Sequence, residues 1–436
     1  MKKILCVSLL LSLSLSSCKT SERVDITLHL NGGTINNKET LVLSPKELQR
    51  LDEYPKLHGK IFSSYYYDPY FSNRFDGDFN ITKSIDLYAK YCDDIFEYKL
   101  ENNTYSIIGI NGDIFSSVEI PDYIENVYVS KVTKESLKNL TINNLFMKSI
   151  EVIEKDTFIN SSINYLEIGD KIKKIEYGAF RKLKNLRAVK IDENSYYSAT
   201  NNVILEKLKG DERIIIGNYG YDKSMFNEDQ LSTIDIVGIA PYSFSNLYIY
   251  DEKLEGKGYT FYIPSTVSEI SESAFEDCNV YCYNEEEQIK IQLGFFFFDN
   301  VEKINKNAFA NSAVTLVKYE IQKIEEAGEI KFIPSETGIE LFGEGAFENT
   351  ELKKIIIPRT VTKIEKNCFF SCDLLTEVYY EGTEEEFKNI VIEEGNEVIH
   401  NAKKYYYSKD YEPGRWYYHC DPNSKIPYLG STVIYE

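Results

Sequence analysis

Two cysteine pairs are the first groups in this sequence with a spacing that suggests chemistry. Cys278 with Cys282 and Cys368 with Cys372 share the spacing C-x₃-C, and closely spaced thiolates can bind a metal ion such as Zn²⁺. The pairs, however, take different places in a hexapeptide that recurs along the chain. Cys278 and Cys372 follow a phenylalanine by three residues, whereas Cys282 lies further on and Cys368 directly precedes a phenylalanine. Because the pairs are not equivalent, we predict buried core positions, with no metal and no cofactor.

Histidines and nucleophiles form no recognisable catalytic motif. The four histidines are His29, His58, His400 and His419, and His419 is followed by Cys420. Neighbours in sequence do not make a nucleophile dyad, because such dyads are assembled across a fold. The motifs G-x-S-x-G, H-E-x-x-H, G-x-G-x-x-G and the P-loop are absent. We predict no enzymatic activity and no catalytic residues, although an acidic pair of the glycosidase kind stays open among 69 acidic residues.

The N-terminus predicts export and lipid attachment. Lys2 and Lys3 form a basic start, and an apolar stretch over residues 4–15 follows, as in a secretory signal. It ends in Leu15-Ser-Ser-Cys18, which resembles a bacterial lipobox, where cleavage precedes a cysteine that carries lipid. We predict a signal peptide over residues 1–17, lipidation at Cys18 and a lipidated linker over residues 18–24. An ordinary signal peptide with an incidental cysteine is the alternative.

Charge and composition restrict the partners. The chain has 436 residues, of which 43% are hydrophobic and 14% aromatic, so it can bury a large core. Without residues 1–17 it keeps 47 basic and 69 acidic side chains, a net charge of −22. Such a surface argues against nucleic acid and against direct adsorption to anionic lipid. The cysteines lack the density of a disulfide scaffold, and whether any of them pair stays open.

The elements that position these residues follow from the recurring hexapeptide, in which an aliphatic residue precedes a phenylalanine by five places. Successive phenylalanines are 22, 64, 31, 34, 38 and 22 residues apart, so the basic unit is 22 residues with insertions, a period typical of leucine-rich repeats. The copies are Ile153–Phe158, Ile175–Phe180, Ile239–Phe244, Ile270–Phe275, Ile304–Phe309, Phe342–Phe347 and Ile364–Phe369, with Val132–Leu137 as a degenerate first copy.

This periodicity predicts a solenoid of stacked coils. Each unit has a short strand such as residues 353–357, and Pro264 and Pro358 follow such strands, where a missing N–H is tolerated. The small fifth residue, for example Ala179, allows coils to approach closely, and the following phenylalanine fills the space between them. Because one coil cannot bury its apolar edge alone, stacking must supply the stability.

The pattern resembles the BspA-type leucine-rich repeat family of bacterial surface proteins, with its consensus I-x-x-x-A-F-x-x-C-x-x-L and a following I-P. Cys278 and Cys372 occupy the family's cysteine position. Residues 191–219 resemble its hairpin insertion, with Asn201-Asn202 at the turn. The resemblance implies a mainly β fold with a leucine-rich repeat solenoid over residues 105–380.

Residues 25–91 predict a separate small domain. Ile26, Leu28 and Leu30 alternate as in a strand and lead into Asn31-Gly-Gly, while Ser44, Pro45 and Glu47 form a helix start. The opening LNGGT and the closing ITKSIDLYAKY resemble the Listeria–Bacteroides repeat, the internalin B-repeat family, with Tyr91 in place of its final Trp. The resemblance implies a β-grasp-like module that acts as a spacer or a weak binding unit.

Residues 381–436 are predicted to form a C-terminal capping module. Thr383 and Glu386 form a capping box for a helix reaching about Ile390, and residues 283–290 look like a second copy of that helix. The tail from Trp416 resembles the BspA-type terminus and would cover the open end of the solenoid. We assign its triple-Glu run to a solvated helix turn rather than to calcium.

Three aromatic runs occur at residues 65–67, 295–298 and 405–407. They could stack on sugars or anchor a protein partner. We expect instead that alternate members are core residues and the others line strand faces. Residues 295–298 are predicted to form a buried strand.

Together these features predict an exported protein, lipid-anchored at the bacterial cell surface, that binds an extracellular protein or glycan by adhesion. Its partners would be that ligand and the membrane through Cys18, with no nucleic acid. The alternatives are capture of glycan or peptide for a transporter or hydrolase, and a structural spacer that binds nothing. The sequence names neither the binding residues nor the ligand.

Overall fold

The computed structural model describes residues 23–200, 203–219, 235–245, 247–250, 259–284, 287–290, 292–326, 329–419 and 431–434. The predicted signal peptide, Cys18, the Asn201-Asn202 turn and Cys420 lie outside these residues. The chain divides into two compact units. The first comprises Met1–Asp94 and Ile124–Asn126, and the second comprises Ile95–Tyr123 and Val127–Glu436.

The first unit is a mixed four-stranded sheet with one short helix. Its strands are ordered β2-β1-β4-β3; β1 and β4 are parallel, and the other two pairs are antiparallel. The predicted alternation is confirmed, because Ile26, Leu28 and Leu87 are fully buried on one face. The elements are β1 (Ile26–His29), β2 (Thr40–Leu43), α1 (Pro45–Gln49), β3 (Lys60–Tyr66) and β4 (Ile85–Asp93).

Local signals in the first unit act as predicted. The Ser44 hydroxyl and the Glu47 carboxylate form a reciprocal capping box at the start of α1. Asn31 and Gly32 have positive φ angles of 47° and 89°, as a tight turn requires. Tyr91, which stands where the resembled family has Trp, donates its hydroxyl hydrogen to the Leu30 carbonyl at 2.7 Å.

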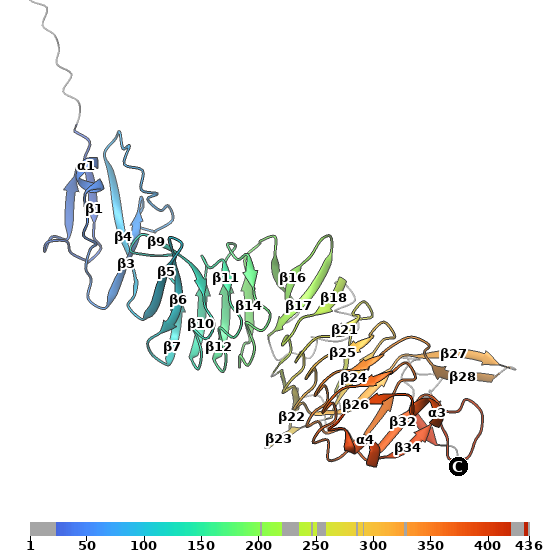
Figure 1. Cartoon of the computed structure of the whole chain (residues 1–436). Coiled ribbons are helices and arrows are strands. Elements are labelled where there is room, and N and C mark those ends of the chain that lie inside the picture. The colour runs from blue at the N-terminus through green and yellow to red at the C-terminus, as the bar shows by residue number, and fades with distance from the viewer. Residues whose placement is uncertain are drawn as a thin grey trace, which may run out of the picture. The chain divides into compact units, whose positions relative to one another are not determined.

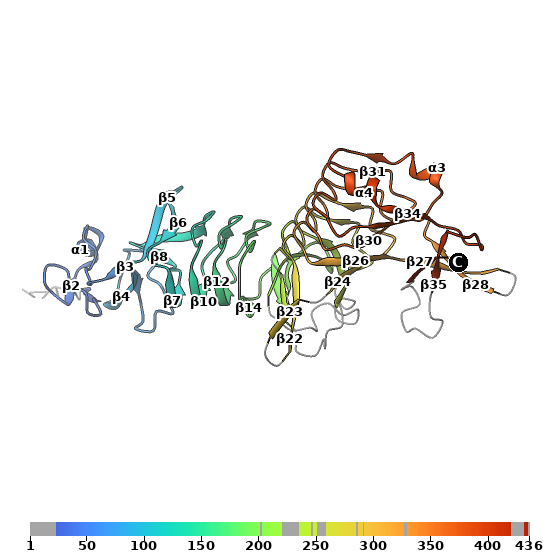
Figure 2. The same ribbon diagram turned by 90° about the horizontal axis from the view of Figure 1, so that it is seen from below.

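The second unit is a β-solenoid of about 11 turns in the part that the structure describes. Its long strands form parallel sheets (Figures 1 and 2). We call residues 104–191 the first block and residues 259–406 the second block. The long strands of the first block are β7 (Ile114–Glu119), β10 (Thr141–Met147), β12 (Ser162–Ile168) and β14 (Ala188–Ile191). Those of the second block are β20 (Tyr259–Tyr262), β24 (Leu293–Phe297), β26 (Val314–Tyr319), β30 (Lys354–Ile357), β32 (Glu377–Tyr380) and β34 (Lys403–Tyr406).

A second ladder of short strands runs along another edge of each turn. Most end at the aliphatic residue that opens the hexapeptide, so Val132, Ile153 and Ile175 pair in register. In the first block they are β9 (Val127–Val132), β11 (Val152–Ile153) and β13 (Lys174–Ile175), preceded by the hairpin β5 (Phe96–Glu101) and β6 (Thr104–Ile110), with β8 (Tyr123–Ile124) beside β9. In the second block they are β21 (Glu269–Ile270), β25 (Lys303–Ile304), β29 (Leu341–Phe342), β31 (Lys363–Ile364) and β33 (Val391–Ile392).

The phenylalanines of the hexapeptides stack face to face inside the solenoid, which confirms the predicted coil packing. Phe158 stacks on Phe180 with ring centroids 5.8 Å apart. A second stack has five rings, four of them in the second block and one, Phe244, just before it; consecutive centroids are 4.9 to 5.4 Å apart and the planes are within 9° of parallel. These rings are Phe244, Phe275, Phe309, Phe347 and Phe369.

Each hexapeptide turn contains left-handed backbone that we did not predict. The fourth residue has a positive φ in every copy, between 52° and 84°. Five of the eight residues are Gly, Asn or Asp, which tolerate this conformation best, and this preference is the signal in the sequence. These residues are Glu135, Asp156, Gly178, Tyr242, Ser273, Asn307, Gly345 and Asn367.

Hairpins interrupt the regular coils. Between the blocks, β15 (Tyr197–Thr200), β16 (Val203–Lys207) and β17 (Glu212–Asn218) form the predicted insertion, and β17 pairs parallel with β18 (Asp235–Ile239). The Tyr197 hydroxyl accepts the Ile175 N–H at 2.8 Å and so extends the short-strand ladder. A further hairpin, β27 (Ile321–Glu326) with β28 (Glu329–Pro334), follows β26 directly.

The helix predicted over residues 283–290 is wrong. The segment belongs instead to the antiparallel hairpin β22 (Asn279–Asn284) and β23 (Glu287–Lys290). β22 also pairs parallel with β19 (Tyr248–Tyr250). Aromatic and β-branched residues before the Glu run favour a strand, and pairing with a neighbouring coil outweighs the local capping signal.

The C-terminal part continues the ladders and then forms two short helices and a tail. The Thr383 capping box is confirmed, but α3 (Glu384–Phe387) ends before Ile390. α4 (Glu397–Asn401) precedes β34. The tail strand β35 (Trp416–His419) pairs antiparallel with β36 (Ser431–Ile434). Trp416 is fully buried and donates its indole hydrogen to the Tyr380 carbonyl at 3.0 Å.

Candidate ligand-binding surface

The outward face of the long strands in the first block is open. β7, β10 and β12 are parallel and in register, which aligns Ser117, Asn144 and Tyr165 in one row and Glu119, Phe146 and Glu167 in the next. The alternate residues, such as Leu145 and Leu166, are fully buried. Because the backbone of the sheet is paired within the solenoid, recognition on this face would rest on the outward side chains.

Those outward side chains combine flat rings with hydrogen-bonding groups. The rings of Phe146 and Tyr165 lie 5.9 Å apart, and the Lys148 ammonium lies 5.8 Å from the Phe146 ring. The Tyr165 hydroxyl donates to the Glu167 carboxylate at 3.0 Å; partial burial, followed by this hydrogen bond, raises the pKa of Tyr165. Such a face can stack on planar or apolar parts of a ligand and bond its polar groups.

The strands β10, β12 and β14 also carry a hydrogen-bonded pair of amides and an ion pair. The Asn164 amide donates to the Asn143 side-chain oxygen at 3.1 Å, and both residues face solvent at least in part. Lys190 pairs with Glu167 at 3.1 Å and with Asp192 at 2.9 Å. The hydrogen bond to Asp192, followed by that to Glu167, raises the pKa of Lys190, so its charge is already matched within the protein.

On the corresponding face of the second block most rings are covered, although Tyr262 is partly exposed and Lys354 and Lys403 are exposed. Residues facing outward there include Phe296, Ile356, Tyr379 and Tyr405, and they are only 2%, 7%, 5% and 8% exposed. The Trp416 ring packs edge-on against Tyr379 at 5.6 Å. Two adjacent, partly exposed rings beside uncovered polar side chains therefore favour the first block as the ligand face.

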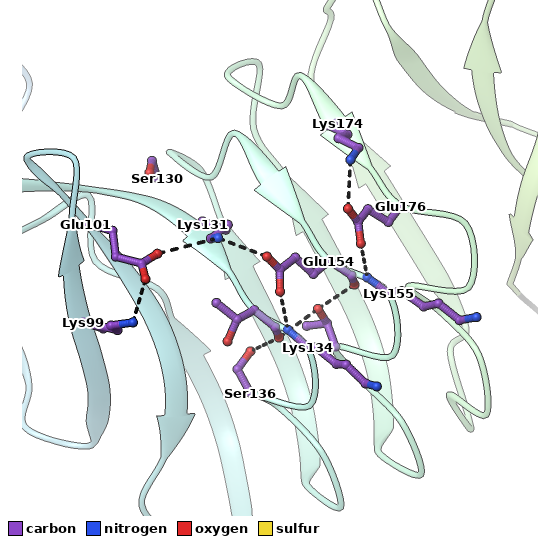
Figure 3. A network of polar contacts seen from close by, with 12 residues as sticks. Lys99, Glu101, Ser130, Lys131, Lys134, Ser136, Glu154, Lys155, Lys174 and Glu176 are labelled. Carbon is purple, nitrogen blue, oxygen red and sulfur yellow. Dashed lines mark hydrogen bonds and ion pairs between the residues drawn. The ribbon is translucent and has the colours of Figure 1, made fainter.

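The edge that carries the short strands is polar but satisfied within the protein. Glu154 accepts the Lys134 N–H at 2.8 Å and pairs with the Lys131 ammonium at 3.0 Å (Figure 3). Glu176 repeats this one turn on, with the Lys155 N–H at 3.0 Å. Each carboxylate thus bonds the backbone of the preceding turn, and we assign this edge to stability rather than to ligand binding.

The second block repeats the same device. Glu365 accepts the Glu344 N–H at 3.1 Å, and Glu393 accepts the Lys366 N–H at 2.9 Å. The Lys363 ammonium bridges Glu365 and Glu393 at 3.0 and 2.9 Å. The hydrogen bond to Glu393, followed by that to Glu365, raises the pKa of Lys363.

A charged cluster lies where the insertion separates the blocks. The Arg181 guanidinium is 3.9 Å from the Asp156 carboxylate and 3.5 Å from the Glu276 carboxylate. The Tyr242 ring contacts two cations, with its centroid 4.3 Å from the Lys155 nitrogen and 4.7 Å from the Arg181 guanidinium. The charges balance each other, so the cluster ties turns from both sides of the insertion together.

Three carboxylates that sequence analysis did not single out line a small pocket at the ends of β24, β26, β30 and β32. Asp299, Glu320 and Glu381 follow β24, β26 and β32, and the parallel coils bring those strand ends together. The residue type directly after an apolar strand, as in Tyr319-Glu320 and Tyr380-Glu381, is the signal that could have found them. The pocket has room for about one water molecule, too little for a substrate.

The three carboxylates of this pocket have different surroundings. Burial raises the pKa of Glu381 to about 7. Burial, together with the nearby Asp299 carboxylate, raises the pKa of Glu320. Asp299 accepts hydrogen bonds from Ser335 and Thr337, both at 3.2 Å.

The cysteines singled out by spacing take different places. Cys278 and Cys372 are buried three residues after stacked phenylalanines, and Cys368 is buried in the small-residue position. The Cys372 thiol donates to the Phe347 carbonyl at 2.9 Å. The side chain of Cys282 lies outside the described residues. Within the described part of the chain, no group of three His, Cys, Asp or Glu residues is arranged to hold a metal ion.

The histidines are distributed over separate elements. His29 in β1 stacks on Tyr88 at 4.6 Å and bonds Asp86 at 2.9 Å. His58 is in the loop before β3, His400 in α4 and His419 in β35, and all three are exposed.

The aromatic runs are mainly core. The prediction of a buried strand at residues 295–298 is confirmed for residues 295–297 by β24, which is buried throughout, while Phe298 follows the strand and is partly buried. Tyr65 and Tyr66 are both buried, so the expected alternation does not hold there; both faces of β3 are covered.

Comparisons with known proteins agree on the repeat. A family model described as "BspA type Leucine rich repeat region" matches in six copies over residues 83–226, 214–333, 248–376 and 292–398, well over half of the chain. No curated protein sequence matches.

Solved structures with similar folds include three bacterial proteins. A leucine rich cell surface protein from Faecalibacterium prausnitzii is 14% identical; the match covers 70% of this chain and 98% of that one, with a TM-score of 0.34. The pneumococcal vaccine antigen PcpA is 14% identical over 73% and 93% of the two chains, with a TM-score of 0.33. A leucine-rich repeat protein from Eubacterium ventriosum is 14% identical over 66% and 82%, with a TM-score of 0.32. TM-scores this low carry no inference about function.

Proposed function

Because this chain belongs to the family of BspA-type leucine-rich repeat proteins, we propose that it is displayed outside the cell and binds a macromolecular ligand along the outward face of the first block. Proteins of the family are generally exported or surface-located. The observation that carries the proposal is the open row of rings and polar groups around Phe146 and Tyr165. A long flat face of this kind suits an extended partner better than a small molecule.

A pull-down with the chain from Lys19 onward, against host and bacterial surface fractions, tests the binding proposal. The face is altered by the double variant Asn144→Ala and Tyr165→Ala. The matched control is Lys354→Ala with Lys403→Ala, at outward positions of the second block. We expect the first double variant to capture the ligand at least tenfold more weakly than wild type, and the control to capture it as well as wild type. Equal capture by both would refute the placement of the ligand.

Attachment by lipid at Cys18 is the second part of the proposal. It rests on the sequence Leu15-Ser-Ser-Cys18 after a basic and apolar start. No helix among the described residues is long and apolar enough to cross a membrane. Labelled palmitate should be incorporated by the wild type and lost in Cys18→Ala. Labelling that survives this change would place the lipid elsewhere.

The module over residues 25–91 is proposed to space the solenoid from the anchor along the chain. The four-stranded mixed sheet with α1 supports a β-grasp-like assignment. Deletion of residues 25–91 should leave ligand capture by the purified solenoid unchanged but reduce capture by whole cells. A loss of capture by the purified protein would instead assign ligand contacts to the module.

Glycan or peptide capture for a neighbouring transporter or hydrolase is a second candidate function. The adjacent rings of Phe146 and Tyr165, with the Asn143 and Asn164 amides nearby, favour it because sugars bind to ring faces and amides. A glycan array separates the two functions. Sugar binding lost in Tyr165→Ala would favour glycan capture, and protein-only binding would favour adhesion. Absence of any binding would favour a spacer.

A further inference from the structure

The tail strand β35 is attached to the solenoid through a buried carboxylate. Glu381, which directly follows β32, is 4% exposed. The Tyr418 hydroxyl donates to one of its oxygens, and the Arg359 N–H donates to the other at 3.3 Å. Two residues before Tyr418, the Trp416 indole bonds the Tyr380 carbonyl at 3.0 Å. Among the contacts of β35, the hydrogen bond between Tyr418 and Glu381 involves an ionisable acid, whereas the bond donated by the Trp416 indole and the bond from the Ser408 N–H to the Trp416 carbonyl do not titrate.

The carboxylate of Glu381 lies among groups that compensate its charge only in part. Tyr319, from β26, lies nearby and is 8% exposed, and its hydroxyl has no hydrogen-bond partner. Glu320, after β26, and Asp299, after β24, line the same pocket and add negative charge. Arg359, after β30, is the nearby cation, but its guanidinium pairs with Glu336 at 3.0 Å. Tyr407 packs against Tyr418 at 6.1 Å.

We propose that Glu381 makes docking of the tail strand β35 sensitive to pH, with the tail held tightly in mildly acidic surroundings and loosened when the surroundings become neutral or alkaline. Protonation removes a buried negative charge beside Asp299 and Glu320. This loss of buried charge favours the docked tail.

The direction follows from the titration of Glu381. Burial raises its pKa to about 7 when docked, and a solvated carboxyl returns toward 4.5. A carboxyl with a raised pKa stabilises the docked state fully below its ordinary pKa and loses that contribution as the pH rises through the raised value. Docking should therefore weaken between about pH 4.5 and 7 and change little above it. Between pH 6 and 8 we expect roughly a tenfold weakening.

Hydrogen exchange of the β35 backbone amides in the full chain tests this proposal. Locally opened states dominate such exchange, so its rate reports tail release even when release is rare. Dividing the wild-type rate by that of Glu381→Gln at the same pH removes the intrinsic pH dependence of exchange. We expect this ratio to rise about tenfold from pH 6 to 8. A ratio that stays constant would overturn the proposal.

A second variant keeps the test independent of how well Glu381→Gln folds. Tyr418→Phe keeps the ring but removes the hydrogen bond that best stabilises the carboxylate. Its β35 amides should exchange faster than wild type at pH 8 and at nearly the wild-type rate at pH 6. Equal acceleration at both pH values would overturn the proposal, because it would assign Tyr418 a role unrelated to ionisation.

Trp416 offers an independent readout because it is the single tryptophan of the chain and is fully buried in the docked tail. In a urea titration, the red shift of Trp416 emission should have a lower midpoint than the loss of far-UV circular dichroism. In the wild type the difference between the two midpoints should be larger at pH 8 than at pH 6. In Glu381→Gln this difference should be the same at both pH values. Coincident transitions at both pH values in the wild type would contradict a separately docking tail.

Discussion

The two blocks of the solenoid use the same hexapeptide but present different surfaces. In the first block the hexapeptides recur every 21 or 22 residues, and the outward Phe146 and Tyr165 stay only partly covered. In the second block the intervals reach 38 residues, and the outward Phe296 and Tyr379 are 2% and 5% exposed. The repeat thus determines the inner face, whereas the surroundings of each coil determine whether the outer face can meet a ligand.

The cores differ in the same way. Phe158 and Phe180 are the stacked pair of the first block, and aliphatic side chains fill most of the rest. In the second block Phe309 contacts rings on both sides of the stack and two more from β24, Phe295 and Phe297. The second block therefore has more aromatic packing in its core than the first block. The proposed ligand face lies in the first block.

The largest expected effect breaks the aromatic stack. Phe309→Ala should lower the free energy of unfolding by about 5 kcal/mol, because it opens a cavity among four rings. Phe158→Ala should cost about 3 kcal/mol, since its cavity borders smaller side chains. Urea unfolding followed by circular dichroism measures both. Equal costs would contradict the stated difference between the cores.

The next prediction concerns the cluster that joins the blocks. Arg181→Met should destabilise the second unit by roughly 2–3 kcal/mol, because Asp156 and Glu276 would keep buried charges without their cation. Lys182→Met is the control, because its ion pair with Asp277 is longer, at 4.0 Å, and nearer to solvent. Calorimetry should show the larger shift in Arg181→Met; equal shifts would argue against a role for this cluster.

The sequence pattern predicted the core of the solenoid, because each coil must bury the same kind of side chain at the same position of the repeat. The Ile-to-Phe spacing was enough to place Phe275 and Phe309 in a stack. An acidic residue after an apolar strand marks Glu320 and Glu381 as candidates, but the spacing could not show that they meet Asp299, since that depends on the lengths of the insertions between them. It also could not show which outer face is open, because Trp416 reaches Tyr379 from 37 residues along the chain.

The third prediction concerns the left-handed turn position, which occurs in both blocks. Asn307→Ala should cost about 1–2 kcal/mol, because a φ of 54° is unfavourable for alanine. Asn307→Gly should be close to neutral, since glycine adopts this conformation readily. Thermal unfolding of both variants gives the comparison. If alanine were tolerated as well as glycine, strain at this position would not constrain the repeat.

The smallest expected effect is on the polar edge. The hydrogen bond from Lys174, followed by that from the Lys155 N–H, lowers the pKa of Glu176. Its stabilisation is therefore present above the ordinary carboxyl pKa and is lost as the pH falls. Glu176→Gln should cost about 0.5 kcal/mol at pH 7 because the site is close to solvent.

The control for this edge is a measurement of the same pair of proteins at low pH. At pH 3 the difference in unfolding free energy between wild type and Glu176→Gln should shrink toward zero. A cost that is larger at pH 3 than at pH 7 would reverse the assigned sign.

Hydroxyl-radical footprinting of the intact chain tests the central difference between the blocks most directly. Phe146 and Tyr165 should be oxidised readily in the free protein and protected when the captured ligand is added. Phe296 and Tyr379 should stay unreactive in both states. Protection that appeared in the second block, with Phe146 and Tyr165 unchanged by ligand, would contradict the account.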